Sequence, residues 1–319
     1  MDFLFSGRGE TDGAVLHFCK FAIMSFSQLK ETIEEGDTVI LYLNPLNLHS
    51  IEVKPEIPNK HDELVDNVFQ TKYGALKIKG LIGQKFGSKV SLSKGWAYVL
   101  HPTPELWTLT LPHRTQIIYS ADISMIIFQL DLKPGCIVIE SGTGSGSLTH
   151  ALARTVSPNG TVHTFDFHKQ RAAIAEAEFA GHKIDSVVKS YHRDVCQLGF
   201  GSDLDSLADA VFLDLPLPWT VVPHAVKVIK KSGGRFCSFS PCIEQVKRTC
   251  EALHDSGFRE IQTMECLQRE LTVRSRTVPI LHPDKEEESE EKMTFTSALP
   301  QPTVPGHTGY LTFATLPPN

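Results

Sequence analysis

Three glycines follow a short apolar run at alternating positions near the middle of the chain. Residues 136–139 have the sequence Cys-Ile-Val-Ile, which predicts a strand buried on both faces, and Gly142, Gly144 and Gly146 follow it. Glycine permits positive φ angles and has no Cβ to hold a ligand away from the backbone. The first amides of the next helix point free N–H groups into the same gap. The pattern therefore predicts a nucleotide-sized slot, although a glycine-rich turn can also serve packing alone.

Acidic residues follow the next two predicted strands. After a helix over residues 147–156, a strand over residues 161–165 ends at Asp166, roughly 20 residues beyond the glycines, where an acid can bind the hydroxyls of an adenosine ribose. A third strand over residues 187–191 precedes Asp194 and Val195, which could bind the amine and ring of an adenine; an aspartate in a surface loop is the alternative. Dehydrogenases that use nicotinamide and methyltransferases that use S-adenosylmethionine (SAM) share this arrangement of a glycine turn and acids at strand ends. The Gly-x-Gly-x-Gly spacing after Glu140 favours SAM.

A fourth strand ends in another acid. Residues 208–214 are mostly apolar and end at Asp214, and Leu-Pro-Leu-Pro-Trp follows at residues 215–219. Ligands of open α/β sheets bind beyond the carboxyl ends of the strands, so Asp214 should face the same crevice as the glycines. The prolines fix a non-helical loop, and Trp219 offers a ring on which a base could stack. Asp214 could instead cap the next helix, but the prolines and the tryptophan favour a functional role.

The alternation of strands and helices continues towards the C-terminus. We predict a helix over residues 168–180, a fifth strand over 233–240, a helix over 241–256, a long sixth strand over 260–271 and a last strand from 306. The mostly acidic run at 284–292 and the stretch rich in Pro, Ser and Thr that follows predict a disordered loop over 281–305. Two strands joined without a crossover helix suggest an antiparallel pair at the edge of the sheet. SAM methyltransferases have this arrangement and dehydrogenases do not.

The chain divides into two predicted domains after an N-terminal extension. Residues 1–23 are expected to be a disordered extension, residues 24–100 a small all-β domain, and residues 101–319 the SAM-dependent domain. Five lysines of the first domain could contact RNA or form a solvated face: Lys77, Lys79, Lys85, Lys89 and Lys94. Residues 101–114 connect the domains in an extended form, with a helix over 115–130 after them. Residues 113–116, His-Arg-Thr-Gln, either line the mouth of the cofactor site or pack as an inter-domain strap.

The composition excludes several classes of protein. The net charge of −6 argues against a protein that holds nucleic acid by its overall charge. The seven cysteines at positions 19, 136, 196, 237, 242, 250 and 266 include no Cys-x-x-Cys pair, so we expect no disulfide framework and no metal site. We predict a reducing compartment, cytosol or nucleus, and place the protein in the nucleus. No apolar run is long enough to cross a membrane, so we expect a soluble protein with no membrane partner.

Four segments carry a resemblance to a known family. Residues 140–147, Asp194 with Val195, residues 212–219 and residues 236–245 closely resemble the catalytic subunits of eukaryotic tRNA (adenine-58-N1)-methyltransferases. The resemblance extends from about Met24 to the C-terminus. It implies a Rossmann-like class I SAM-dependent methyltransferase, α/β, with a seven-stranded, mostly parallel sheet and a small N-terminal all-β domain. The implied reaction is methylation of N1 of adenine-58 in the T-loop of tRNA, with T-loop-like sites in mRNA as further substrates.

The resemblance also implies site residues and a partner. The catalytic residue would be Asp214. The implied cofactor-binding residues are Ile118, Gly142, Gly144, Ser145, Gly146, Ser147, Asp166, Arg171, Asp194, Val195 and Asp214. The implied RNA-binding residues are Leu213, Leu215, Pro216, Ser238, Phe239, Ser240, Pro241, Gln245 and Thr308. Family members usually have Glu where this chain has Asp166, and the shorter acid should still reach a ribose hydroxyl. The implied partner is a related non-catalytic, tRNA-binding subunit in a dimer of heterodimers, a heterotetramer.

Two other functions remain open at this point. A nicotinamide-dependent oxidoreductase would also be compatible with the glycine turn. A non-catalytic RNA-binding subunit could keep the fold without the chemistry, but it would not need to keep both the glycines and Asp214.

Overall fold

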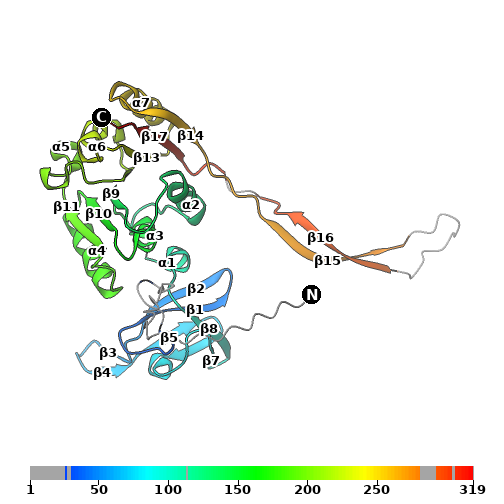
Figure 1. Cartoon of the computed structure of the whole chain (residues 1–319). Helices are drawn as coiled ribbons and strands as arrows, with labels where there is room; N and C mark the ends of the chain where they lie inside the picture. The colour runs from blue at the N-terminus through cyan, green and yellow to red at the C-terminus, as the bar shows by residue number, and fades with distance from the viewer. Residues whose placement is uncertain (1–25, 27–29, 113, 281–291, 304–305, 319) are drawn as a thin grey trace, which may run out of the picture.

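The computed structural model describes residues 26, 30–112, 114–280, 292–303 and 306–318. A small β domain, a larger α/β domain and a two-stranded arm make up the chain (Figure 1). The predicted extension over residues 1–23 lies outside the described residues. Among the residues described, no helix combines the length and apolar character needed to cross a membrane.

The N-terminal domain consists of short strands, as predicted. Its elements are β1 (Thr38–Asn44), β2 (Asn47–Glu52), β3 (Glu56–Pro58), β4 (Leu64–Asp66), β5 (Val68–Thr71), β6 (Gly74–Lys77), the 3-10 turn η1 (Ile78–Leu81), β7 (Lys89–Leu92) and β8 (Gly95–Leu100). Four of the strands form an antiparallel sheet in the order β2-β1-β8-β7, while β3-β4 and β5-β6 form two separate ribbons. Because side chains alternate along each strand, Val39, Leu41, Ala97 and Val99 share one face of this sheet and fill the core of the domain.

Two helices connect the domains, and the sequence predicted only one of them. Helix α1 (Pro104–Thr110) occupies part of the segment that we expected to be extended. Proline is tolerated in the first turn of a helix, where its missing N–H has no partner to lose, and the Thr103 side chain caps the helix by accepting from the Leu106 amide. The expected helix over 115–130 is shorter, because α2 (Ser120–Gln129) begins after an extended segment.

The α/β domain is built on one seven-stranded sheet. Its strands are β9 (Ile137–Ser141), β10 (Thr161–Asp166), β11 (Val188–His192), β12 (Ala210–Asp214), β13 (Gly234–Ser240), β14 (Arg259–Met264) and β17 (Tyr310–Leu316). The order is β11-β10-β9-β12-β13-β17-β14, and the first five strands are parallel. Strand β17 runs antiparallel to both β13 and β14, so the predicted antiparallel pair at the edge is confirmed.

Helices cover both faces of this sheet and create a three-layer core. The further helices are α3 (Ser147–Val156), α4 (Lys169–Gly181), α5 (Val195–Leu198), α6 (Val222–Val228), α7 (Ile243–Asp255) and the short turns η2 (Ser202–Leu204) and η3 (Pro218–Thr220). Apolar side chains of α2, α3 and α4 pack on one face of the sheet, and those of α6 and α7 pack on the other. With both faces covered, the carboxyl ends of the parallel strands are left as the place for a ligand.

The arm corrects the prediction for the C-terminal region. Strand β15 (Leu271–Pro279) pairs with β16 (Lys292–Pro300) in an antiparallel hairpin that extends away from the domain (Figure 1). The prediction of a disordered loop over 281–305 is therefore wrong for residues 292–300, and the predicted long strand over 260–271 ends at Met264. The loop prediction averaged the acidic run with a following segment, Met-Thr-Phe-Thr-Ser-Ala-Leu, that favours a strand. Residues 281–291 and 304–305 lie outside the described part of the chain.

Candidate functional site

The glycine loop connects β9 to α3 and bends with positive φ angles at all three glycines. Gly142 has φ +100°, and a Cβ at this position would lie 2.3 Å from the backbone oxygen of Asp214. Gly146 adopts the left-handed conformation at the start of α3, with φ 76°. A side chain at Gly142 would therefore push the glycine loop and the end of β12 apart. The backbone of this loop is exposed to the cavity beside it.

Asp214 stands at the carboxyl end of β12, next to the glycine loop. Strand β12 pairs with β9 so that Leu213 is opposite Ser141, which places Asp214 beside Gly142. Burial raises the pKa of the Asp214 carboxyl to about 6. No described residue donates a hydrogen bond to this carboxylate, and the next helical turn, η3, begins only at Pro218. The helix-cap alternative does not apply, since the carboxylate faces a cavity with its hydrogen-bonding capacity unused.

A second buried acid, Glu140, lies next to the glycine loop. Glu140 is the penultimate residue of β9, only 1 % exposed, and accepts a hydrogen bond of 2.7 Å from the Thr149 hydroxyl of α3. Burial and, to a smaller extent, the nearby charge of Asp214 raise the pKa of Glu140 to about 7. Because two neighbouring buried carboxylates repel when both are ionised, Glu140 binds its proton more tightly than an exposed glutamate does.

Asp166 at the end of β10 connects the second strand to the glycine loop. Its carboxylate accepts a hydrogen bond of 3.3 Å from the Gly144 amide and one of 2.8 Å from the His168 amide. Arg171 binds the same carboxylate through Nε at 3.1 Å and through an Nη at 2.9 Å. This two-point ion pair holds Asp166 at the rim of the cavity, so a ribose hydroxyl would compete with Arg171 for its oxygens.

The third acid, Asp194, follows β11 and caps α5. Its carboxylate accepts a 3.0 Å hydrogen bond from the Cys196 amide, and Val195 is 2 % exposed beside it. Asp194 caps α5 and also lines the cavity, and its contact with an adenine amine stays a prediction.

A cavity of about 800 Å³ collects these groups at the carboxyl ends of the strands. Eleven predicted residues line it: Gly142, Gly144, Asp166, Arg171, Asp194, Val195, Asp214, Leu215, Pro216, Pro241 and Gln245. A narrow neighbouring pocket is lined by the other four cofactor residues, Ile118, Ser145, Gly146 and Ser147. Both spaces share Gly142, Gly144 and Asp214, so the glycine loop and the carboxylate face one site. A drug-sized or nucleoside-sized ligand fits such a volume.

Comparison with known proteins identifies the family. Residues 95–298 match the family model described as "tRNA methyltransferase complex GCD14 subunit". The chain belongs to this family. It is 39% identical over 315 residues to the tRNA (adenine(58)-N(1))-methyltransferase catalytic subunit of Dictyostelium discoideum, covering 90% of this chain and 97% of that protein. The catalytic subunit of the same name from Candida albicans is 46% identical over 259 residues, or 80% of this chain and 74% of that protein.

Solved structures support the fold of this GCD14-family chain. A SAM-dependent O-methyltransferase from Thermotoga maritima superimposes with a TM-score of 0.72 at 27% identity, covering 90% of this chain and 95% of that one. The tRNA (m1A58) methyltransferase of Aquifex aeolicus has a TM-score of 0.65 at 23% identity, covering 89% and 98%. The Rossmann-like fold of SAM-dependent methyltransferases, with an N-terminal β region, is thereby confirmed.

Several residues predicted to bind RNA lie away from the cavity. The side chains of Leu213, Ser238 and Ser240 are fully buried, and Phe239 is 8 % exposed in the core. Thr308 is exposed and does not line the cavity. Contacts of the four buried residues with a substrate would have to use their backbone, and these roles stay predictions. Gln245 has a structural role, since its side-chain amide donates a 2.9 Å hydrogen bond to the Pro216 carbonyl and so connects the loop after Asp214 to α7.

Trp219 does not line the cavity. It is partly buried beneath the guanidinium of Arg248, which lies 5.1 Å from its ring. Pro218 is also buried, whereas Pro216 lines the cavity. The turn η3 moves the tryptophan away from the strand end, and the loop sequence did not reveal this turn.

The sequence also missed lining residues that neighbour the predicted acids. Phe167 follows Asp166 and is 61% exposed, and Arg193, Cys196 and Gln197 surround Asp194. Only their position in the sequence could have indicated this role, since residues next to an acid at the end of a strand lie at the same edge of the sheet. Thr115 and Gln116 do line the cavity, as one alternative proposed, while His113 lies outside the described residues.

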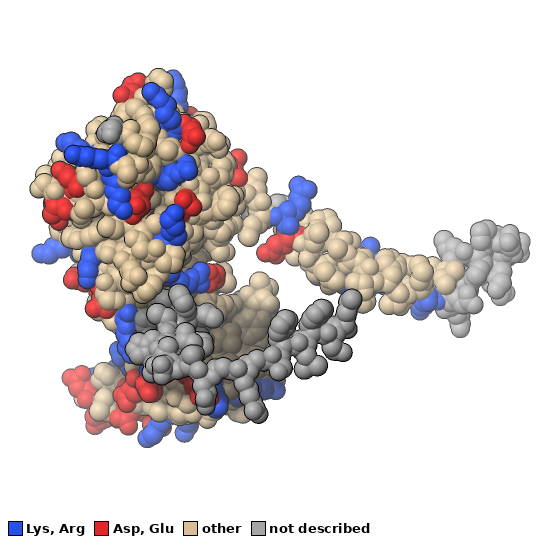
Figure 2. Space-filling model, in the orientation of Figure 1, with Lys and Arg blue, Asp and Glu red and all other residues tan. Residues whose placement is uncertain are grey.

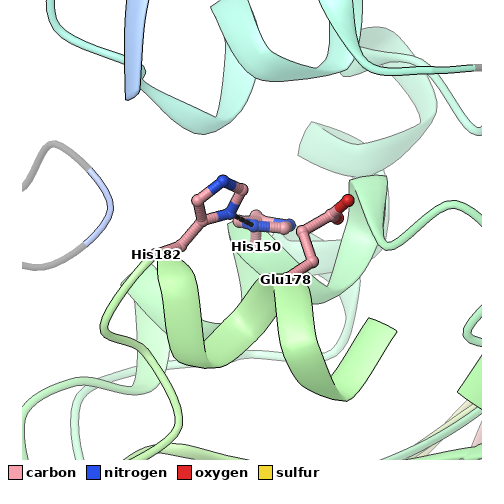
Figure 3. A group of neighbouring side chains, drawn as sticks. All are labelled: His150, Glu178 and His182. Carbon is pink, nitrogen blue, oxygen red and sulfur yellow. Dashed lines mark hydrogen bonds between the residues drawn. The ribbon is translucent and has the colours of Figure 1, made fainter. Parts of the chain in front are cut away.

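A buried histidine pair supports the glycine loop from the side of the N-terminal domain. His150 of α3 donates through Nδ1 to the Gly146 carbonyl at 2.6 Å, so its Nε2 accepts from His182 Nδ1 at 2.8 Å (Figure 3). Burial lowers the pKa of His150 to about 4 and that of His182 to about 3. The pair is therefore neutral above pH 5.

Glu178 lies beside the two histidines (Figure 3) and is engaged by a cation. Its carboxylate pairs with Arg114 at 2.6 Å, and the same guanidinium reaches the Ser145 carbonyl at 3.4 Å. Ligand atoms of His150, Glu178 and His182 lie within 4.8 Å of one another, which is the spacing of a metal site. The positive charge of Arg114 disfavours a metal cation at this place, and we interpret the group as a positioning network for the glycine loop.

Proposed function

We propose that this chain is the catalytic subunit of a tRNA (adenine-58-N1)-methyltransferase and transfers a methyl group from SAM to N1 of adenine-58 in the T-loop. The observation that carries the proposal is the carboxylate of Asp214 beside Gly142, with both lining one cavity at the carboxyl ends of the strands. Family membership and the names of the relatives support the reaction class and the substrate.

The lining and the volume of the cavity, about 800 Å³, support SAM as its ligand. Because Gly142 has no Cβ, the glycine loop lies directly against the end of β12. Asp166 and Asp194 present carboxylates at the two positions where ribose hydroxyls and an adenine amine bind in Rossmann-like sites. Bound SAM supplies a methyl group that its sulfonium already activates. The task of the protein is then to bind the two substrates in line and to keep water out of the reaction path.

Asp214 is proposed to make the target nitrogen a better nucleophile. Its free carboxylate can accept a hydrogen bond from the N6 amine of the adenine, which moves electron density towards N1. The same negative charge stabilises the positive charge that develops on the base during methyl transfer. Although burial raises the pKa of Asp214 to about 6, this value lies below neutral pH, so the carboxylate is mostly ionised there and can accept this hydrogen bond.

The base must leave its stack before it can reach Asp214. N1 lies on the Watson–Crick edge, so an adenine has to be unpaired or flipped into a pocket, at a cost of a few kcal/mol. Leu215 and Pro216 follow Asp214 at the cavity wall, and the Gln245 hydrogen bond fixes their backbone. A rigid loop at this place would select an extruded base by its shape. T-loop-like sites in mRNA are proposed as further substrates on the same chemical ground.

A second subunit is proposed to supply much of the RNA affinity. The net charge of −6 leaves this chain with little general attraction for RNA. The β15–β16 arm supports such a partner, because an isolated two-stranded hairpin is marginally stable and this one exposes Leu271, Val273, Met293 and Phe295. We propose that a related non-catalytic subunit covers the arm in a dimer of heterodimers, in the nucleus. Light scattering of the co-expressed complex should give the mass of a heterotetramer, and an arm-deleted variant should give a smaller one.

A methylation assay on tRNA transcripts tests the reaction. The chain is co-expressed with a candidate partner subunit and incubated with SAM and either a wild-type transcript or one with adenine-58 replaced by guanine. N1-methyladenine blocks Watson–Crick pairing, so primer extension should stop at position 58 of the wild-type transcript alone. The Asp214→Ala variant should give no stop. Methylation of both transcripts, or near-normal turnover by the variant, would refute the proposal.

A further inference from the structure

The charges of the N-terminal domain are sharply divided along the chain. Residues 30–66 contain nine acids and three lysines, whereas residues 67–104 contain six lysines and no acid. The ribbon β3–β4 lies in the acidic half, and Figure 2 shows red side chains gathered at the place that β3 and β4 occupy in Figure 1, with blue ones along the lower edge of the domain. The basic half of this domain can therefore attract a polyanion although the protein as a whole is acidic.

The basic half includes two strands whose outer face is exposed and aromatic. Inner residues of β7 and β8 fill the domain core, so the alternate residues point outwards. Lys89 is opposite Tyr98, and Tyr98 is opposite Tyr42, which places the three side chains in one row across β7, β8 and β1. Trp96 is 47% exposed and Tyr98 38%, on the same face of β8. We call Tyr42, Lys89, Trp96 and Tyr98 the Trp96 face.

Rings and cations alternate on the Trp96 face and at its rim. The Lys89 ammonium lies 3.9 Å from the centre of the Trp96 ring, and the Trp96 and Tyr98 rings meet edge to face at 5.3 Å. At the rim, Lys72 lies over Tyr73, and Tyr73 is 40% exposed next to the turn at Gly95. Neither Lys72 nor Lys89 pairs with a carboxylate of any described residue. Their charges are therefore available to an outside ligand.

We infer that the Trp96 face is a second RNA-binding surface, separate from the methyl-transfer cavity. Exposed aromatic rings stack unpaired bases whatever their sequence, and nearby lysines neutralise phosphates of the backbone. Strands β1, β7 and β8 contain no acid, so nothing on them repels a phosphate. A protein partner would be a poorer fit, since protein interfaces are depleted in lysine, while Lys89 lies on this face and Lys72 at its rim. The inference rests on the proposed function only for the identity of the RNA, a tRNA.

Two sets of variants in the full chain, with the partner subunit that co-purifies, test the Trp96 face. In Trp96→Ala/Tyr98→Ala, loss of stacking should raise the Kd for a tRNA transcript about tenfold. In Lys72→Gln/Lys89→Gln, the dependence of log K on log salt should become shallower by about one to two, as expected for two lost phosphate contacts. Lys54→Gln/Lys60→Gln makes the same charge change in the acidic half and should leave affinity and salt dependence unchanged.

Kinetics and assembly separate this inference from its alternatives. The variants should raise KM for tRNA in proportion to Kd, while kcat at saturating tRNA and the heat of SAM binding stay at the wild-type value. Affinities of both variants within twofold of the wild type would overturn the inference, and so would a loss of affinity that coincides with a smaller mass in light scattering, because the face would then hold a protein. If the wild type fails to methylate tRNA, the proposed function fails, and the affinity comparison still decides the role of this surface.

Discussion

Replacing Asp214 by asparagine should abolish activity and stabilise the protein. In the folded chain burial raises the pKa of Asp214 from 3.8 to about 6. The ionised carboxylate then lowers the free energy of unfolding by about 3 kcal/mol at every pH above 6. Asparagine removes the charge but keeps a buried polar amide, so we expect a net gain of about 1–2 kcal/mol, or about 3–6 °C in Tm.

The stability gain of Asp214→Asn over the wild type should depend on pH. Both the folded and the unfolded chain bind the proton below pH 4, so the carboxylate costs nothing there. The cost grows as pH rises from 4 to 6 and is constant above, because the unfolded chain loses the proton first. The Tm advantage of Asp214→Asn over the wild type should therefore be small near pH 4 and full at pH 8.

Calorimetric Tm values at pH 4 and pH 8, together with the methylation assay, measure both effects. Asp205→Asn, a substitution of an exposed aspartate, serves as the control and should change neither Tm nor activity. Wild-type kcat/KM should fall as pH decreases through 6, since the protonated carboxyl no longer accepts from the N6 amine. An Asn variant that is less stable than the wild type at pH 8, or that retains methyl transfer, would refute the reasoning.

Three further perturbations test the surroundings of Asp214. Gly142→Ala places a Cβ 2.3 Å from the Asp214 backbone oxygen at φ +100°, so it should lower Tm and remove the thermal shift by SAM, whereas Gly257→Ala, at φ +86° with no atom within 4 Å, should lower Tm only slightly. Arg171→Ala frees the oxygens of Asp166 but leaves its buried charge unpaired. We expect the affinity for SAM, measured by titration calorimetry, to change at least severalfold. An unchanged affinity would show that this ion pair lies outside the cofactor site. The buried His150 and His182 have pKa values below 6.5 in the folded chain, so the free energy of unfolding should fall by up to about 2 kcal/mol for each histidine between pH 7 and pH 5. In urea titrations, His182→Phe should lose less stability over this range than the wild type. An equal loss would contradict a neutral histidine pair.

Local rules made the glycine loop and the strand-end acids predictable from the sequence. Apolar runs fixed the strands, and the carboxyl ends of parallel strands meet at one edge, so Gly142, Asp166, Asp194 and Asp214 had to approach one another. The antiparallel last strand followed from the missing crossover helix. These arguments need only the type and order of the elements.

Features that depend on tertiary contacts could not be predicted from the sequence in this way. His150 and His182 are 32 residues apart on different elements, and nothing in their spacing predicts the hydrogen bond between them. The burial of Ser238 and Ser240 follows from the covering of β13 by α7, which the strand pattern alone did not indicate. The expected extended segment over residues 101–114 contains α1 instead, because Pro104 begins a helix that the Thr103 side chain caps.

Titration calorimetry with SAM tests the central claim most directly. The wild type and Asp214→Ala are each titrated with SAM, and the same samples are assayed for methyl transfer to tRNA. We predict one SAM bound for each chain in both proteins, with Kd values within a few-fold of each other, and methyl transfer by the wild type alone. Absence of SAM binding to the wild type, or loss of binding in Asp214→Ala together with normal turnover at high SAM, would contradict a shared cavity in which Asp214 acts on the base.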